Sequence, residues 1–359
     1  MKAKKLVLKN GMEFIGQGFG CDKVAEVIFN TSMIGYQDIL RDPSYTGKIV
    51  CMTYPLIGNH GASDDDFGSR ELHVEGFIVK DYEFTAANYR YIDSMVEVLE
   101  ANNIPFICDI DTRMLAKVIR DQGSMLGMIT DVKTTKEEAL KKIEEYTPSK
   151  DLIKKLTSRR TNVIKANKPK YEVVCIDLGI KNNIVENLVY RNCNVIVLPY
   201  NVDSEKVMSY KPDGLFISNG PVSFDECEAV LQVIKDLKGK LPIAGIGLGH
   251  LLMAKASGAN IDKMKFGHHG ANQSVRCLKT NKIDITSQSH DYVVNSLSLE
   301  NTDLKPTHIN IADNTIEGLS SDKMFISLQY NPEDAQGFES NVKLYDELLT
   351  LMKENRGVK

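Results

Sequence analysis

The chain has 359 residues, of which 42% are hydrophobic and 26% charged, and its formal net charge is −4. This composition is typical of a globular protein with two domains of average size, and so weak a charge argues against nucleic acid or an anionic membrane as the main partner. No apolar run approaches the ~18 residues of a membrane span, and the basic N-terminus lacks the apolar segment of a secretory signal.

The seven cysteines are scattered along the chain, and no two of them form a CxxC pair. An odd number without metal-ligand or disulfide spacing favours a reducing compartment, so we expect a cytoplasmic protein.

Residues 1–146 are predicted to form an α+β domain. Residues 5–8 alternate in polarity, Asn10-Gly11 is typical of a hairpin turn, and residues 12–15 fit the returning strand. The apolar spacing then becomes helical over residues 93–99 and 111–122. The acidic run Asp64-Asp65-Asp66 is expected to be a solvated loop rather than a cation site.

Residues 147–170 differ in composition from both flanks. Eight Lys or Arg and a single acidic residue lie between Lys150 and Lys170, with Pro148 and Pro169 near the two ends. We interpret this stretch as a solvated linker between domains; docking on an acidic partner is the alternative.

From residue 171 to 359, strand patterns alternate with helical ones. Buried strands are predicted at 172–178, 193–198, 214–217 and 242–246, and helices at 181–191 and 249–257. A further helix is expected to begin at a capping box formed by Ser223 and Glu226 and to end at Gly239. This alternation predicts a doubly wound, mainly parallel sheet, so the fold class is α/β.

The most informative segment is residues 242–252, Pro-Ile-Ala-Gly-Ile-Gly-Leu-Gly-His-Leu-Leu. An apolar strand enters a turn of small residues and continues as a helix, which is the pattern of a nucleophile elbow with Gly247 at its apex. Taken alone the pattern is weak, because phosphate-binding loops are similar.

The neighbouring motifs indicate which family the segment resembles. It resembles the G-I-C-L-G-H-Q turn of class I glutamine amidotransferases, with Gly247 at the cysteine position. Residues 218–221 (Ser-Asn-Gly-Pro) resemble that family's oxyanion loop, and residues 329–333 (Gln-Tyr-Asn-Pro-Glu) its Q-x-H-P-E motif. Residues 29–37, 42–45, 109–113, 177–182 and 266–272 are similar to motifs of carbamoyl phosphate synthase small subunits.

The resemblance implies a small subunit that releases ammonia from glutamine for a large subunit, where bicarbonate and ATP complete carbamoyl phosphate. Its catalytic cysteine, histidine and glutamate correspond here to Gly247, Asn331 and Glu333. Glycine has no side chain, and an amide cannot accept a proton near neutral pH. We therefore expect the glutaminase activity to be lost, so that the enzyme depends on free ammonia. No cofactor is expected in this chain; ATP and Mg belong to the large-subunit partner.

The family's glutamine-binding positions are also altered. Leu251 stands where the family has a glutamine, Ser289 and Asp291 replace an asparagine and a glycine, and Val222 replaces a glycine. Because these changes remove hydrogen-bonding partners for an amide, glutamine binding should be weak or absent. The full set of positions that the resemblance assigns to glutamine is Ser44, Gly220, Val222, Leu248, Leu251, Ser289, Asp291 and Tyr292.

Four histidines, at 250, 268, 269 and 290, have no cysteine or carboxylate at ligand spacing, so we expect packing or hydrogen-bonding roles and no metal. Two other functions stay open: a stand-alone pseudoenzyme with a regulatory or interaction role, and an active glutaminase with an unusual nucleophile. The pathway served, arginine or pyrimidine synthesis or nitrogen disposal, is also open.

Overall fold

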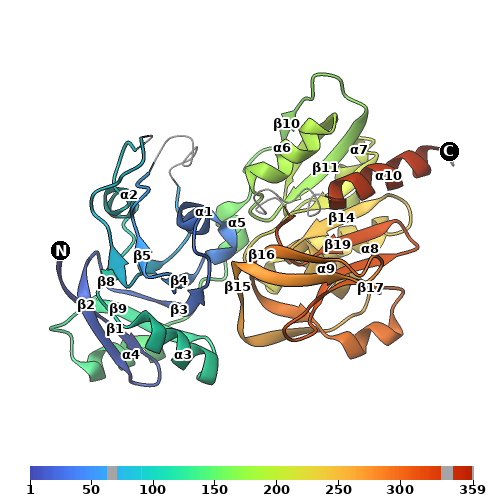
Figure 1. Ribbon diagram of the computed structural model, residues 1–359. Coiled ribbons are helices and arrows are strands. Elements are labelled where there is room, and N and C mark those ends of the chain that lie inside the picture. The colour runs from blue at the N-terminus through green and yellow to red at the C-terminus, as the bar shows by residue number, and fades with distance from the viewer. Residues whose placement is uncertain (63–70, 90, 333–342, 358–359) are drawn as a thin grey trace. The chain divides into compact units, whose positions relative to one another are not determined.

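The computed structural model describes residues 1–62, 71–89, 91–332 and 343–357, and the chain divides into two compact units, Met1–Ser149 and Lys150–Lys359 (Figure 1). The acidic run at 64–66 and Glu333 lie outside the described residues. Within the described part of the chain, no helix has the length and apolar character needed to cross a membrane.

The first unit is built around a closed barrel with the strand order β1-β2-β8-β6-β4-β3-β9. Its barrel strands are β1 Lys2–Leu8, β2 Glu13–Phe19, β3 Lys23–Asn30, β4 Lys48–Met52, β6 Gly76–Ile78, β8 Phe106–Cys108 and β9 Met125–Asp131. A separate parallel pair is formed by β5 Leu56–Ile57 and β7 Asp81–Tyr82. The helices are α1 Tyr36–Arg41, α2 Met95–Ala101, α3 Thr112–Gln122 and α4 Lys136–Glu145.

The predicted hairpin and the two predicted helices of this unit are confirmed. β1 and β2 pair antiparallel, and Gly11 takes the positive φ of 83° that the turn requires. Helix α2 begins at a capping box between Ser94 and Glu97, and α3 begins where the Asp111 carboxylate accepts a hydrogen bond from the backbone N–H of Met114.

The second unit contains a sheet in the order β10-β12-β11-β13-β14-β19-β18-β17-β15-β16. Its strands are β10 Asn162–Ile164, β11 Tyr171–Asp177, β12 Cys193–Pro199, β13 Gly214–Ile217, β14 Ile243–Ile246, β15 Ile261–Cys277, β16 Ile283–Val294, β17 Lys305–Asn310, β18 Ile316–Ser321 and β19 Phe325–Leu328. Its helices are α5 Leu152–Leu156, α6 Asn182–Tyr190, α7 Ser204–Ser209, α8 Glu228–Leu237, α9 Leu248–Ala256 and α10 Lys343–Gly357.

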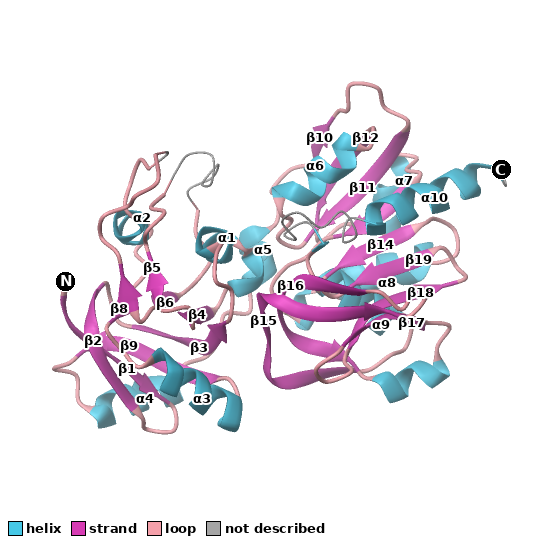
Figure 2. Ribbon diagram, in the orientation of Figure 1, coloured by secondary structure: helices cyan, strands magenta, loops and turns pink. Residues whose placement is uncertain are grey.

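The predicted parallel, doubly wound core is present in this sheet. β12, β11, β13, β14 and β19 pair parallel in that order, with helices on both faces (Figure 2). Alternate residues of β11 separate the two faces: Val174 and Ile176 pack in the cluster that contains α8 and α9, whereas Val173 and Cys175 pack with α6 and α10. Beyond β19 the sheet continues with antiparallel strands, which the sequence analysis did not anticipate.

The interpretation of residues 147–170 as a linker needs correction. From Lys150 onward the segment belongs to the second unit, where β10 pairs with β12 and Ile153 of α5 is fully buried. The many lysines and arginines do not reveal these elements in the sequence, because a short edge strand and a one-turn helix bury few side chains and leave the charged ones in water.

The expected capping box of Ser223 and Glu226 is also wrong. These residues border a short 3-10 helix, the Ser223 side chain makes no capping hydrogen bond, and α8 starts later, at Glu228. The Glu226 carboxylate instead accepts hydrogen bonds from the backbone N–H groups of Ile153 and Lys154, at 3.1 and 3.0 Å. It therefore caps α5, a helix far away in the sequence.

Candidate functional site

The elbow at Gly247 lies at the carboxyl edge of the parallel strands. Ile246, the last residue of β14, pairs with Leu328 of β19, and Gly247 donates its N–H to the carbonyl of Leu328 at 3.0 Å. On the other side of β14, the segment that follows Ile217 of β13 begins at Ser218. Loops at this edge of a doubly wound sheet form the usual ligand site of such folds.

Gly247 has φ 57° and ψ −112°, between the end of β14 and the first residue of α9. This positive φ on the strand-to-helix turn was predicted from the sequence and is confirmed. A side chain other than hydrogen would be strained there, as at a nucleophile elbow.

The three glycines of the elbow are needed for different reasons. A Cβ at Gly245 would lie 2.5 Å from Sδ of Met253, and one at Gly249 would lie 2.3 Å from the carbonyl oxygen of Ile217, so both glycines let α9 pack closely on the strands. A Cβ at Gly247 would meet Cβ and Cα of Asn219 at 3.5 and 3.7 Å, which are ordinary contact distances. The elbow therefore has room for a side chain at 247, and its backbone dihedral is the obstacle.

Residues 218–221, which resemble the family's oxyanion loop, are held in place by hydrogen bonds of the Ser218 hydroxyl. Oγ of Ser218 accepts the N–H of Leu178 at 2.9 Å and donates to the carbonyl of Asn219 at 2.8 Å. Gly220 is pressed against the Leu178 carbonyl, only 2.1 Å from where its Cβ would be. Asn219 is 1% exposed and its Nδ2 has no hydrogen-bond partner among the described residues, so a donor beside Gly247 is left unused.

Asn331, at the family's base position, follows β19 and is buried. Its backbone N–H donates to the carbonyl of Ser287, and its Nδ2 donates to Oγ of Ser289 at 3.1 Å. Two positions at which the chain departs from the family pattern, 289 and 331, are thus in direct contact. An amide at this place can donate and accept hydrogen bonds but cannot take up a proton.

The positions assigned to glutamine on α9 point into the protein. Leu248 is 2% exposed and Leu251 is fully buried, and both belong to the apolar cluster between α8 and the sheet. Val222 and Tyr292 pack against the same cluster, with the Tyr292 ring edge-on to Phe224 at 5.7 Å. The surroundings of both leucines are therefore apolar.

Ser44, which the resemblance also assigns to glutamine binding, belongs to the first unit. It lies in the short 3-10 helix Pro43–Tyr45, and its backbone N–H donates to the carboxylate of the N-cap residue Asp42 at 2.9 Å. The side chain is nearly buried.

Asp291, where the family has glycine, has a specific partner. Its Oδ1 lies 2.9 Å from Nε2 of His269, and both side chains are buried. Gly267 passes beside this pair with φ 70°, and a Cβ there would come within 2.6 Å of both the Asp291 carboxylate and a backbone oxygen. Although the resemblance assigns a glycine to position 291, the buried Asp291 carboxylate has a hydrogen-bonding partner in His269.

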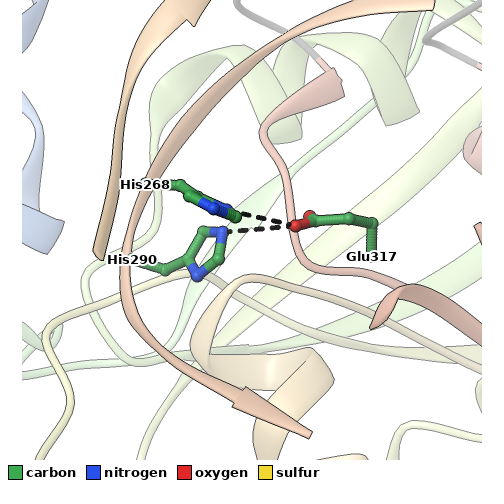
Figure 3. A group of neighbouring side chains, drawn as sticks. All are labelled: His268, His290 and Glu317. Atoms are coloured by element: carbon green, nitrogen blue, oxygen red, sulfur yellow. Dashed lines mark ion pairs between the residues drawn. The ribbon is translucent and has the colours of Figure 1, made fainter. Parts of the chain in front are cut away.

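A second buried polar group was missed by the sequence analysis. His268 of β15, His290 of β16 and Glu317 of β18 point toward one another (Figure 3). The expectation that these histidines have no carboxylate nearby is wrong, because β18 brings in Glu317 from far along the sequence. The one signal for it was a charged residue within an apolar strand, between Ile316 and Gly318.

Electrostatics within this group are strongly coupled. Although burial opposes it, hydrogen bonds to Asp313 and Glu317 raise the pKa of His268 to about 9. Burial, together with the neighbouring His268 and His269, lowers the pKa of His290 well below its usual value. Burial also raises the pKa of Glu317, although His268 partly offsets this. One histidine therefore carries the positive charge and the other is neutral.

His250, on α9, is separate from that group and fully buried. Its Nδ1 lies 2.9 Å from Oγ of Ser327, and its Nε2 has no hydrogen-bond partner among the described residues. Burial lowers its pKa to about 3, so the ring is neutral. It has the packing and hydrogen-bonding surroundings that the sequence analysis expected.

Comparison with known proteins follows the two-unit division. The family model of the carbamoyl-phosphate synthase small chain, CPSase domain, matches residues 6–129, and that of glutamine amidotransferase class-I matches residues 174–351. Both matches agree with the motifs found in the sequence.

Several relatives match over nearly the whole chain. The carbamoyl phosphate synthase small chain of Bacillus caldolyticus is 43% identical over 354 residues, covering 98% of this chain and 97% of the relative. That of Oceanobacillus iheyensis is 40% identical over 359 residues, covering 99% and 98%. The carbamoyl phosphate synthase pyrimidine-specific small chain of Bacillus subtilis is 41% identical over 353 residues, covering 98% and 96%.

Proposed function

The chain belongs to the carbamoyl phosphate synthase small-chain family, and we propose that it is a small subunit that supports carbamoyl phosphate formation without hydrolysing glutamine. In this proposal it binds a large synthetase subunit in the cytoplasm. The large subunit, with ATP and Mg, joins bicarbonate to ammonia taken from solution. The small subunit contributes its fold and its contacts rather than a nitrogen donor.

The observation that carries the proposal is the glycine at the apex of the elbow. Amide hydrolysis of this kind needs a nucleophile that forms a covalent acyl intermediate, and the backbone of Gly247 offers none. The neighbouring base position holds Asn331, whose amide donates to Ser289 and cannot accept the proton of a nucleophile. Loss of the nucleophile alone lowers such activities by several orders of magnitude.

The apolar surroundings of Leu251 support the same proposal. Leu251 is fully buried among apolar side chains, at the position where the resemblance implies an amide side chain. A ligand amide placed there would give up its hydrogen bonds to water without replacing them, at a cost of about 1–3 kcal/mol. We therefore propose that glutamine binds weakly or not at all.

The first experiment is co-purification with a large synthetase subunit, followed by synthesis assays with ammonium or glutamine as the nitrogen source. Ammonium should support carbamoyl phosphate formation by the complex, and glutamine should not. The control is the large subunit alone with ammonium. A higher rate of synthesis by the complex than by the large subunit alone would show that the small chain supports the reaction.

Two outcomes of these experiments would contradict the proposal. Glutamine-driven synthesis at the rate obtained with ammonium would contradict the proposal and favour an unusual nucleophile. Failure to bind any large subunit would favour the stand-alone pseudoenzyme instead.

A further inference from the structure

We propose that His268, His290 and Glu317 form a binding site for a divalent transition-metal ion, with Zn²⁺ as the best match. The proposed ion would join β15, β16 and β18 in the antiparallel half of the sheet (Figure 3). This inference concerns a different part of the second unit from the elbow, and it does not depend on whether glutamine is hydrolysed.

The facing atoms have the spacing of metal ligands. Oε1 of Glu317 lies 3.4 Å from Nδ1 of His268 and 3.7 Å from Nε2 of His290, and the three ligand atoms all lie within 4.8 Å of one another. In a tetrahedral zinc site with bonds of about 2.0–2.1 Å, neighbouring ligand atoms are about 3.4 Å apart. Small side-chain rotations would bring the three atoms onto one ion.

The outer nitrogen of each ring is already held by an acceptor. Nε2 of His268 lies 3.0 Å from the Asp313 carboxylate, and Nδ1 of His290 lies 3.1 Å from the backbone carbonyl of Tyr292. In the neutral ring of His290 the proton therefore lies on Nδ1, which leaves the lone pair of Nε2 on the side of Glu317. His268, which carries a proton on both nitrogens without an ion, would release the proton of Nδ1 when the ion binds. Carboxylate and carbonyl acceptors behind the ligating histidines are the usual support of a metal site.

Two neighbouring amides contact the ring nitrogens that face Glu317, one with its donor end and the other with its acceptor end. Nδ2 of Asn310 lies 3.4 Å from Nδ1 of His268, and Oδ1 of the same amide accepts the N–H of Ala312, so the donor end of the amide faces the ring. Oε1 of Gln288 lies 3.1 Å from Nε2 of His290, while Nε2 of Gln288 donates to Thr286. Gln288 thereby offers Oε1 as a fourth ligand atom beside the proposed ion.

The cluster is buried, and one of its acceptors lacks a donor within the described part of the chain. Glu317 is fully buried, and its Oε2 has no hydrogen-bond partner among the described residues. Two carboxylates, Asp313 and Glu317, flank the rings, so a divalent cation would neutralise a local excess of negative charge. Two imidazoles with one carboxylate suit Zn²⁺ better than Mg²⁺ or Ca²⁺, which prefer oxygen ligands throughout.

An ion would reach the site past Asp313. The Asp313 side chain is 38% exposed, whereas that of His268, directly behind it, is 8% exposed. The carboxylate therefore connects the buried group with the solvent, and could attract a cation before it passes to the ring nitrogens.

The direct test uses the full chain without a histidine tag, stripped of metal with a chelator and then titrated with Zn²⁺. We expect one Zn²⁺ per chain to remain after buffer exchange, measured by mass spectrometry of the element, and a higher melting temperature. A metal-free protein that retains no Zn²⁺ and melts at the same temperature with and without it would overturn the proposal.

Variants distinguish binding at this site from binding by cysteines, because thiolate is also a zinc ligand. Glu317→Gln should weaken Zn²⁺ binding by more than 100-fold, and Asp313→Asn, which removes the outer support of His268, by about 10–100-fold. His308→Gln is the matched control, since His308 stacks edge-on against Tyr330 outside the cluster. Equal Zn²⁺ binding in Glu317→Gln and the unchanged protein would overturn the proposal.

A second readout does not depend on how well Glu317→Gln folds. Co²⁺ added to the unchanged, metal-free chain should give the visible absorption of a nitrogen- and oxygen-ligated ion, and Asp313→Asn should weaken its binding. The intense near-ultraviolet band of cobalt bound to thiolate would instead place the ion on cysteines and contradict the assignment.

Discussion

The amide of Asn331 donates a hydrogen bond to the hydroxyl of Ser289 over 3.1 Å. The resemblance assigns a histidine to position 331 and an asparagine to position 289, so both residues of this contact depart from the pattern that it implies. A serine hydroxyl accepts from an amide as well as it would from an imidazole, and the pair is therefore consistent in itself. Because the two residues touch, we expect substitutions at 289 and 331 to be non-additive.

The first prediction concerns the nucleophile. Gly247→Cys alone should not release glutamate, because Asn331 cannot take the thiol proton and a free cysteine near neutral pH is only a few per cent thiolate. Adding Asn331→His supplies a base, so a thiol-reactive glutamine analogue should modify Cys at 247 faster in the double variant. Peptide mass spectrometry measures the modification at 247, with the exposed Cys21 as the internal reference. Full glutamine turnover by the single variant would contradict this.

The elbow glycines should differ in their tolerance of a methyl group. Gly247→Ala should lower stability by about 1–3 kcal/mol, the cost of a positive φ, because its Cβ would make only a 3.5 Å contact with Asn219. Gly249→Ala should cost more, since its Cβ would be forced to 2.3 Å from the Ile217 carbonyl oxygen and α9 would have to move. Melting temperatures of the two variants give the order, and the reverse order would show that the helix is free to shift.

His250 should make stability depend on pH. Burial lowers its pKa to about 3, whereas an unfolded histidine titrates near 6.5. Between these values the unfolded chain binds the extra proton, so stability is complete above about pH 6.5 and falls by up to about 1.4 kcal/mol per pH unit below it. His250→Asn should fall less steeply as pH decreases. The loss should remain in part, because burial also lowers the pKa of His308, to about 4.

Denaturant unfolding of both proteins at a series of pH values checks this. The informative quantity is the difference in slope, because His250→Asn also changes the contact with Ser327 and so shifts stability at every pH. Parallel curves for the two proteins would mean that His250 is protonated in the folded state.

The parallel core could be predicted from the sequence because its signals are local. Each strand of residues 172–246 is a continuous apolar run, each is followed by a helix, and the elbow has its own pattern of small residues. The positive φ of Gly247 followed from the same pattern.

What could not be predicted depends on long-range pairing. Glu317 meets His268 and His290 only because β17 lies between β15 and β18 in the sheet, and neither a period nor a motif encodes that order. In the same way, Glu226 caps a helix that starts 74 positions earlier in the chain, at Leu152 (226 − 152 = 74). A local S-x-x-E pattern at residues 223–226 indicated a capping box that does not form.

The Glu226 cap of α5 should contribute to the stability of the second unit. Glu226→Ala should destabilise the second unit by about 0.5–2 kcal/mol, because the N–H groups of Ile153 and Lys154 lose their acceptor at the start of α5. Glu228→Ala, an exposed residue in the first turn of α8, is the matched control and should have a smaller effect. Limited proteolysis within residues 150–170 should become faster in Glu226→Ala only. Equal rates in the two variants would indicate that the Glu226 carboxylate does not hold α5 in place.

The last prediction is that restoring the family's site costs stability in this fold. A six-fold variant with Gly247→Cys, Asn331→His, Leu251→Gln, Ser289→Asn, Asp291→Gly and Val222→Gly should release more glutamate than the double variant, since the pocket regains polar groups. It should also be the least stable of the series. Leu251→Gln places an amide at a fully buried position, and Asp291→Gly removes the carboxylate that lies 2.9 Å from His269.

Glutamate release with the large subunit present, and melting temperature without it, measure the two effects separately. Asp291→Gly alone is the control for the loss of the His269 partner, because it changes stability without supplying a nucleophile. If Gly247→Cys alone were as active as the six-fold variant, the pocket around it would be competent to bind glutamine. The changes at Leu251, Ser289 and Asp291 would then be neutral, and the present chain would be one residue away from an active glutaminase.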